Sequence, residues 1–203
     1  MRIALVVVIL VGCAGSIATF FWRQDIKYSL PTPVPTNYEP IQIGKAVGLS
    51  WLNNNRSHFL HFYNPDCPCS KFNVRHIKSL VRSYGDSLTI LVILASESDI
   101  PKAKSELGAN LSYRVDADQS IAKACGVYST PQAAIIDKDG ILFYRGNYNA
   151  SRYCSKRASN FAELSLIALL NHQPSPSFGL LATHSYGCEL KSGKEPVSYL
   201  LNF

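Results

Sequence analysis

Two cysteines separated by a single proline, Cys67 and Cys69, stand between two different hydrophobic patterns. The residues before them, 58–63, form a short, mostly apolar and aromatic run with the length of a strand. After them, apolar residues recur at three- and four-residue steps, which predicts a helix that begins at the cysteines. Pro68 suits the first turn of that helix, and Asp66 is expected to cap it. The pattern therefore places both cysteines at the junction between a strand and a helix.

The rest of the sequence alternates between strand-like and helix-like segments. Residues 87–95 form a continuous apolar run, which is typical of a strand buried on both faces of a parallel sheet. Further helices are expected at 43–52, 101–107, 119–125 and 160–171, and further strands at 133–136 and 142–145. This order predicts an α/β fold with helices on both faces of one sheet.

The N-terminal residues form a separate apolar segment. Residues 3–22 are apolar apart from Ser16 and Thr19, and about twenty such residues suffice for a helix to cross a bilayer. We interpret residues 1–27 as a membrane anchor or signal segment, and favour an uncleaved anchor because the segment stays apolar to its end. The residues before Cys13 resemble a lipoprotein box, so lipidation at Cys13 and cleavage of the leader stay open alternatives.

The remaining chain divides into three parts. Residues 28–40 contain four prolines, which favour an extended and semi-rigid linker. One globular domain is expected over residues 41–172, because a chain of 203 residues is short for two full domains. Residues 173–203 then form a C-terminal tail that contains Cys188.

Charge and cysteine content narrow the function classes. The formal net charge of +6 is spread along the chain without a long run of like charges, so we expect no nucleic-acid partner. The spacing of the six cysteines does not repeat a zinc-binding pattern, so we expect redox chemistry and neither a metal nor another cofactor.

Three local motifs together resemble the thioredoxin superfamily: Phe59-Leu60-His61-Phe62-Tyr63 before the cysteines, Ser129-Thr130-Pro131, and Asp137-Lys138-Asp139-Gly140 followed by Tyr144-Arg145-Gly146. The resemblance covers about residues 41–171 and is closest to membrane-tethered, TlpA-like and redoxin-like proteins of bacterial envelopes. It implies a thioredoxin-like fold with a central mixed sheet. It also implies that Pro131 is a cis-proline whose loop lies against the cysteines and accepts the substrate backbone. The segment 187–191 resembles a Gly-Cys motif of some peroxiredoxin-like proteins.

The cysteine motif departs from that family. Ser70 stands where the second cysteine of the usual Cys-x-x-Cys would be. Since a helix N-terminus stabilises a thiolate, Cys67 is expected to attack, and Cys69 is the first choice as its resolving partner. A distant cysteine, Cys154 or Cys188, is the alternative, and these two could also form a structural disulfide with each other. Four thiols allow three pairings, and the choice stays open.

Two further cysteine and histidine positions complete the candidate site. Cys125 ends an expected helix and is predicted to be buried. His61 stands where the resemblance places thioredoxin's buried acid, so it is a candidate proton acceptor, with simple packing on the strand as the alternative. A peroxidase is less favoured, because neither Cys67 nor Cys69 has the Thr or Ser three residues earlier that peroxiredoxins use.

These observations predict a thiol–disulfide oxidoreductase that exchanges disulfides with protein thiols in the bacterial cell envelope. The soluble domain would lie in the periplasm, held at the inner membrane by a single helix, and would work with an unidentified redox partner. The alternative is a copper-binding accessory protein or chaperone on a thioredoxin fold. A third possibility is a degenerate domain whose cysteines only cross-link.

Overall fold

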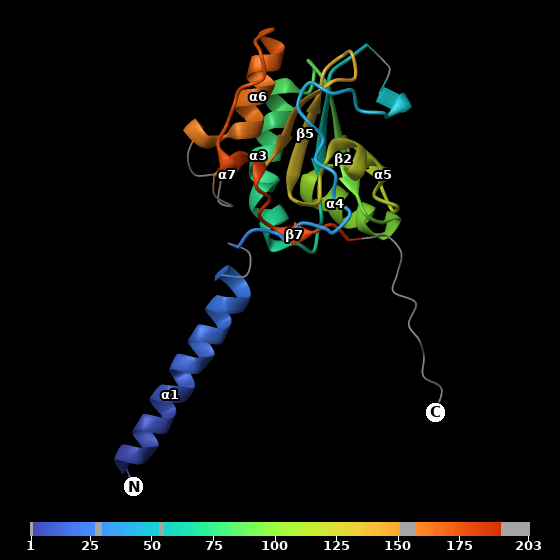
Figure 1. Cartoon of the computed structure of the whole chain (residues 1–203). Coiled ribbons are helices and arrows are strands. Elements are labelled where there is room, and N and C mark those ends of the chain that lie inside the picture. Colours follow the sequence, from blue (N-terminus) through green and yellow to red (C-terminus); the bar gives the residue numbers. More distant parts are fainter. Residues whose placement is uncertain (1, 27–29, 53–54, 151–156, 192–203) are drawn as a thin grey trace.

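The computed structural model describes residues 2–26, 30–52, 55–150 and 157–191 (Figure 1). Its core is a five-stranded sheet in the order β3-β2-β1-β5-β6. The strands are β1 (His58–Phe62), β2 (Thr89–Leu94), β3 (Ser112–Val115), β5 (Gln132–Ile136) and β6 (Leu142–Gly146). The β1–β2 and β2–β3 pairs are parallel, whereas β1–β5 and β5–β6 are antiparallel. The sheet is therefore mixed, and the predicted thioredoxin-like α/β fold is confirmed.

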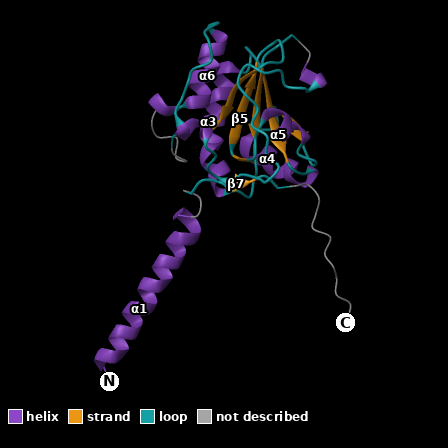
Figure 2. Cartoon of the chain, in the orientation of Figure 1, coloured by secondary structure: helices purple, strands orange, loops and turns teal. Residues whose placement is uncertain are grey.

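Helices cover both faces of this sheet (Figure 2). On one face, α3 (Pro68–Tyr84), α4 (Ile100–Leu107) and α6 (Phe161–Leu170) pack with Phe59 and Tyr63 in one apolar cluster. On the other face, α5 (Ser120–Cys125) packs with Leu60 and Phe62 in a second cluster. The alternation of these side chains along one strand follows from the two-residue period of a strand. The helices expected at 101–107, 119–125 and 160–171 are confirmed to within a few residues.

The expected helix at 43–52 is wrong. Only Ser50–Leu52 form a short 3-10 helix there. The preceding residues run beside the β5–β6 hairpin, where the backbone N–H groups of Gly44 and Val47 donate to the carbonyls of Leu142 and Gly140. Gly44 has a φ of +87°, which lies outside the helical region and which glycine adopts readily. Pairing with the hairpin satisfies the backbone that a helix would otherwise satisfy internally.

The N-terminal helix α1 (Arg2–Phe21) has no buried residue and projects away from the domain (Figure 1). Its mean hydropathy of 2.6 and its length of 20 residues are sufficient for a membrane span. A signal sequence has the same length and composition, so these two properties describe an apolar helix of either kind. A short π-helical turn, η1 (Trp22–Ile26), follows it.

The linker and the C-terminal tail meet at one end of the sheet. The tail contains α7 (Leu180–Thr183) and the strand β7 (Cys188–Glu189), which pairs antiparallel with β4 (Ser129–Thr130). On the other side of the tail, Pro31 forms a β-bridge with Tyr186. The remaining short turns are η3 (Glu97–Asp99) and η4 (Arg157–Ser159). The tail is thus held between the linker and the loop that carries β4.

Candidate functional site

The loop between β1 and α3 places Cys67 at the N-terminus of the helix. Cys67 is the N-cap residue of α3, and Pro68 occupies the first turn. The N–H of Cys67 donates to the carbonyl of Asn64 at 3.0 Å, and the N–H of Asp66 donates to Oδ1 of Asn64 at 2.9 Å. The Asp66 side chain does not cap the helix, contrary to the expectation, because it forms ion pairs elsewhere. The loop is therefore a tight turn that fixes Cys67 at the positive end of a helix of 17 residues.

Cys67 forms a disulfide with Cys188, although the two residues are 121 positions apart. Their Cα atoms are 6.1 Å apart, which is a common separation for a disulfide. The partner of Cys67 in the structure is therefore not the expected Cys69, which is a free thiol. The disulfide also differs from the considered Cys154–Cys188 bridge, and Cys154 itself lies outside the described residues.

The loop before β5 lies directly against this disulfide. The Thr130–Pro131 peptide bond is cis, which is the geometry that the resemblance implied for Pro131. The carbonyl oxygen of Thr130 lies 3.6 Å from Sγ of Cys67. Since a disulfide sulfur carries no proton, this is a van der Waals contact and becomes a hydrogen bond only when Cys67 is a thiol.

The tail runs across the Thr130–Pro131 loop in an extended conformation and forms a short strand there. In the β4–β7 pair, Cys188 lies opposite Thr130 and Glu189 lies opposite Ser129. Gly187 has a φ of +144°, and a Cβ added there would overlap the carbonyl oxygen of Thr130. Only glycine therefore allows the tail to approach the loop this closely. The sequence showed the Gly-Cys pair, but not the surface on which it lies.

An ion-pair cluster fastens the tail to the opposite side of the site. Asp66 accepts from Nζ of Lys102 at 2.7 Å and from Nζ of Lys191 at 2.9 Å. Hydrogen bonds from these two ammonium groups lower the pKa of Asp66 to about 2. About half of each side chain is exposed, so each pair is worth little on its own. Sequence reasoning missed this cluster because Lys191 is remote from Asp66 along the chain.

Cys69 and Cys125 are buried free thiols. Cys69 is 2% exposed, and burial raises its pKa to about 11. Burial likewise raises the pKa of Cys125 to about 12, and its predicted burial is confirmed. Both side chains are therefore protonated at neutral pH, while Cys67 is the cysteine placed at the helix N-terminus. A role for Cys69 as the resolving thiol stays a prediction.

His61 is fully buried on β1, on the face covered by α3. Its Nδ1 is 2.7 Å from the hydroxyl of Tyr148, and its Nε2 has no hydrogen-bond partner. Burial, assisted by the nearby His76, lowers the pKa of His61 to about 3, so the ring is neutral. The proton-acceptor role stays a prediction, and so weak a base fits it poorly at neutral pH.

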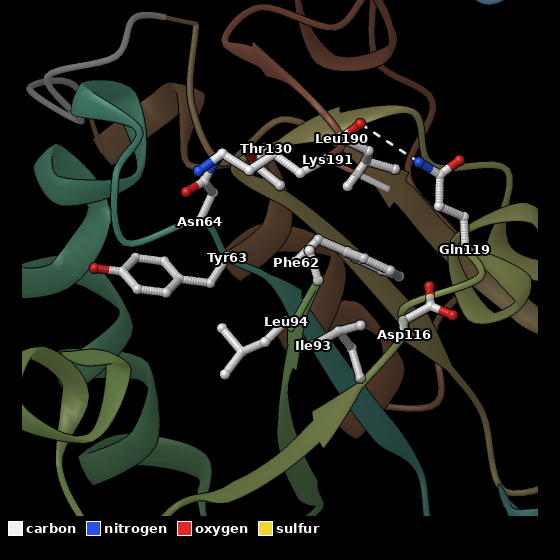
Figure 3. Close-up of a pocket in the computed structure, with 11 residues that line it drawn as sticks. Phe62, Tyr63, Asn64, Ile93, Leu94, Asp116, Gln119, Thr130, Leu190 and Lys191 are labelled. Carbon is white, nitrogen blue, oxygen red and sulfur yellow. Dashed lines mark hydrogen bonds between the residues drawn. The ribbon is translucent and has the colours of Figure 1, made fainter. Parts of the chain in front are cut away.

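A small pocket opens beside the docked tail (Figure 3). The ends of β1 and β2 contribute Phe62 and Ile93, and the tail contributes Leu190. Nε2 of Gln119 donates to the carbonyl oxygen of Leu190 at 3.4 Å, drawn as the dashed line in Figure 3. Among the described residues, no three His, Cys, Asp or Glu side chains are grouped to hold a metal ion.

Comparison with known proteins agrees with this architecture. A hypothetical protein from Sinorhizobium meliloti matches with a TM-score of 0.60 and 20% identity, over 75% of this chain and 96% of that chain. A conserved protein from Geobacillus kaustophilus matches with a TM-score of 0.60 and 23% identity, over 79% and 97%. A putative thiol:disulfide interchange protein DsbE from Chlorobium tepidum matches with a TM-score of 0.52 and 17% identity, over 64% and 99%. At these identities the matches establish the fold.

The sheet order, the cis-proline loop and the disulfide at the N-terminus of α3 define a protein with a thioredoxin-like fold. More narrowly, residues 42–189 match the family described as "Domain of unknown function (DUF6436)", and the chain belongs to this family. A search of curated proteins found no match.

Proposed function

We propose that this chain is a thiol–disulfide oxidoreductase whose redox couple is Cys67 and Cys188, and that it exchanges disulfides with protein thiols. The observation that carries the proposal is the Cys67–Cys188 disulfide at the N-terminus of α3, in contact with the Thr130–Pro131 loop. A helix N-terminus stabilises a thiolate, and the thiolate is the form that attacks a disulfide.

The reaction begins from the reduced protein. The Cys67 thiolate attacks one sulfur of a substrate disulfide, forms a mixed disulfide and expels the other substrate sulfur as a thiolate. The Cys188 thiolate then attacks Sγ of Cys67 and releases the second substrate thiol. Two protein thiols have supplied two electrons, and the product is the Cys67–Cys188 disulfide seen in the structure. Oxidation of substrate dithiols follows the same steps in reverse.

Cys188 is the resolving residue in this proposal because it is already bonded to Cys67, whereas Cys69 is a buried free thiol. The carbonyl of Thr130 is positioned to accept a hydrogen bond from the Cys67 thiol when the disulfide opens. Cys69 and His61 then help to pack the interior beside the site rather than react with substrate.

For the setting of this chemistry, we propose the bacterial envelope. The helix Arg2–Phe21 would hold the protein at the inner membrane, with the domain in the periplasm, where disulfides persist. A further redox protein would restore the starting state of the cysteines after each turnover. A reporter fused after residue 203 would give signal only in the periplasm, and cytoplasmic signal would overturn this placement.

The test of the function uses the full-length protein in detergent and a protein disulfide such as insulin, with a thiol reductant as electron source. The wild-type chain should accelerate reduction, and Cys67→Ser should abolish the acceleration. Cys125→Ala, which changes a buried thiol outside the site, is the matched control and should keep the activity. Stoichiometric copper binding by reduced protein without disulfide exchange would overturn the proposal in favour of a metal-binding role.

A further inference from the structure

The tail places Cys188 where the cysteine of a substrate would be joined to Cys67 during exchange. The intramolecular disulfide is therefore equivalent in its bonds to the mixed disulfide of the reaction. From the contacts of residues 187–191 we propose that the tail is an internal copy of the substrate, and that the site selects extended peptide segments with the sequence Gly-Cys-x-apolar-basic. This inference rests on the proposed function and adds the substrate class to it.

The position before the cysteine accepts only glycine. Gly187 adopts a φ of +144°, which side chains other than glycine rarely allow. A Cβ at this position would overlap the Thr130 carbonyl oxygen and lie 3.4 Å from Cδ of Pro131. A substrate that follows the path of the tail across this loop meets the same obstacle, because the loop belongs to the protein core.

The cysteine and the residue after it are held through their backbone. Cys188 and Glu189 pair with Thr130 and Ser129 as the second strand of a small sheet. Main-chain pairing is independent of side-chain identity, and the Glu189 side chain is exposed. The position after the cysteine is therefore open to any residue that can adopt an extended conformation.

The second position after the cysteine calls for an apolar side chain. Leu190 is partly buried and packs against the apolar cluster that contains Phe62 and Ile93. The same side chain lines the pocket in Figure 3. The Leu190 carbonyl also accepts from Gln119, so this residue is fixed by its side chain and its backbone. A polar residue here would lose the apolar burial without gaining a partner.

The third position calls for a basic side chain. Nζ of Lys191 lies 2.9 Å from Oδ2 of Asp66, the residue immediately before Cys67. Oδ1 of Asp66 is held by Lys102, so the carboxylate stays aimed at the site even when the tail leaves. The net charge of +6 attracts acidic peptides at long range. Because this long-range field disfavours basic peptides, a measured preference for a basic residue at this position would arise from the local contact with Asp66.

The experiment uses the full chain carrying Cys188→Ala, which removes the resolving thiol and with it the disulfide that holds the tail on the loop, so that a peptide can take the place of the tail. The substrates are synthetic peptides of the sequence Ser-Tyr-Gly-Cys-Glu-Leu-Lys, with the cysteine carried as a thionitrobenzoate mixed disulfide. The Cys67 thiolate attacks the peptide sulfur, a Cys67–peptide disulfide forms, and the coloured thionitrobenzoate leaves as its thiolate. The rate of colour release is measured, and the rate of a chain carrying both Cys67→Ser and Cys188→Ala is subtracted.

Three altered peptides test the three positions. Numbered as in the tail, Gly187→Ala should slow the reaction about tenfold or more, because the obstacle is backbone. Leu190→Gln should slow it severalfold, and Lys191→Glu about two- to fivefold, as suits an exposed ion pair. In the protein, Asp66→Asn should abolish the Lys191→Glu difference and leave the Gly187→Ala difference unchanged. Identity of the adduct as peptide on Cys67 is checked by mass spectrometry.

The outcomes separate the two proposals. If every peptide reacts with Cys67 at the same rate, or if the lysine preference survives Asp66→Asn, the substrate inference is overturned while the exchange function stands. If no peptide and no small aromatic disulfide reacts with Cys67, the proposed function itself fails. The small disulfide makes none of the tail contacts, so its rate reports the intrinsic reactivity of Cys67 in each protein, and every peptide rate is divided by it before the proteins with Asp66 and with Asp66→Asn are compared.

Discussion

Lys191 lies three residues beyond Cys188, and its ammonium group is 2.9 Å from the carboxylate of Asp66, which directly precedes Cys67. The disulfide and the ion pair therefore join the same two segments of chain at neighbouring points. The tail is fastened by a covalent bond that redox chemistry opens and by an ion pair that salt weakens.

The ion pair gives the first prediction. Asp66→Asn should increase the rate at which dithiothreitol reduces the Cys67–Cys188 disulfide, by about two- to fivefold, because the tail moves away more easily. High salt should have the same effect on the wild-type protein and little on the variant. Asp139→Asn breaks an exposed ion pair with Lys138 elsewhere on the surface and should leave the rate unchanged. Equal acceleration by Asp139→Asn would contradict the account.

A second prediction concerns the sulfur that an incoming thiol attacks. Cys67 is 1% exposed in the closed structure, whereas Cys188 is partly exposed. Glutathione should therefore join Cys188 and release Cys67 as a thiolate at the helix N-terminus, a favoured leaving group. Brief treatment with glutathione, alkylation and peptide mass spectrometry would locate the adduct. Glutathione on Cys67 and alkylation on Cys188 would show that the tail opens before attack.

Gly187→Ala in the protein itself is the third prediction. The added methyl group collides with the Thr130 carbonyl, so the tail should no longer dock, and the disulfide should form about tenfold less favourably in a glutathione redox buffer. Gly48→Ala is the control, since a Cβ there meets no atom within 4 Å. A disulfide equally stable in both variants would mean that the tail is held by the disulfide alone.

The fourth prediction is a pH dependence that arises from His61. Its pKa is about 3 in the folded protein and about 6.5 when unfolded, so the unfolded chain binds more protons between these values. Stability should therefore fall as the pH is lowered from about 6.5 towards 3, by up to about 1.4 kcal/mol per pH unit from this residue. The free energy of unfolding of His61→Asn, measured with denaturant at several pH values, should depend less steeply on pH than that of the wild-type protein. Wild-type and variant slopes that coincide would show that His61 is not buried in its neutral form.

Local patterns predicted the parts of the site that depend on neighbouring residues. The strand before Cys67 and the helix after it follow from hydrophobic spacing, the burial of Cys125 follows from the tendency of cysteine to be buried, and all three are confirmed. The tail pairing could not be predicted in this way, because β4 and β7 contain two residues each and carry no periodic signal. The disulfide likewise depends on how the chain folds between two cysteines that are 121 positions apart.

Two errors have physical causes of the same kind. Residues 43–52 have helical spacing, but the exposed backbone of the β5–β6 hairpin offers them hydrogen bonds, and tertiary pairing prevails over local preference. Asp66 is a good capping residue by type, yet two lysines from distant segments bind its carboxylate. In both places a long-range contact decides the local structure.

In the proposed mechanism Cys188, rather than Cys69, is the redox partner of Cys67. The direct measurement compares Cys69→Ala with Cys188→Ala in steady-state reduction of a protein disulfide, after thermal unfolding shows both variants folded. We expect near wild-type turnover for Cys69→Ala and accumulation of an unresolved Cys67–substrate disulfide for Cys188→Ala. Full turnover by Cys188→Ala together with arrest of Cys69→Ala at the mixed disulfide would contradict this mechanism.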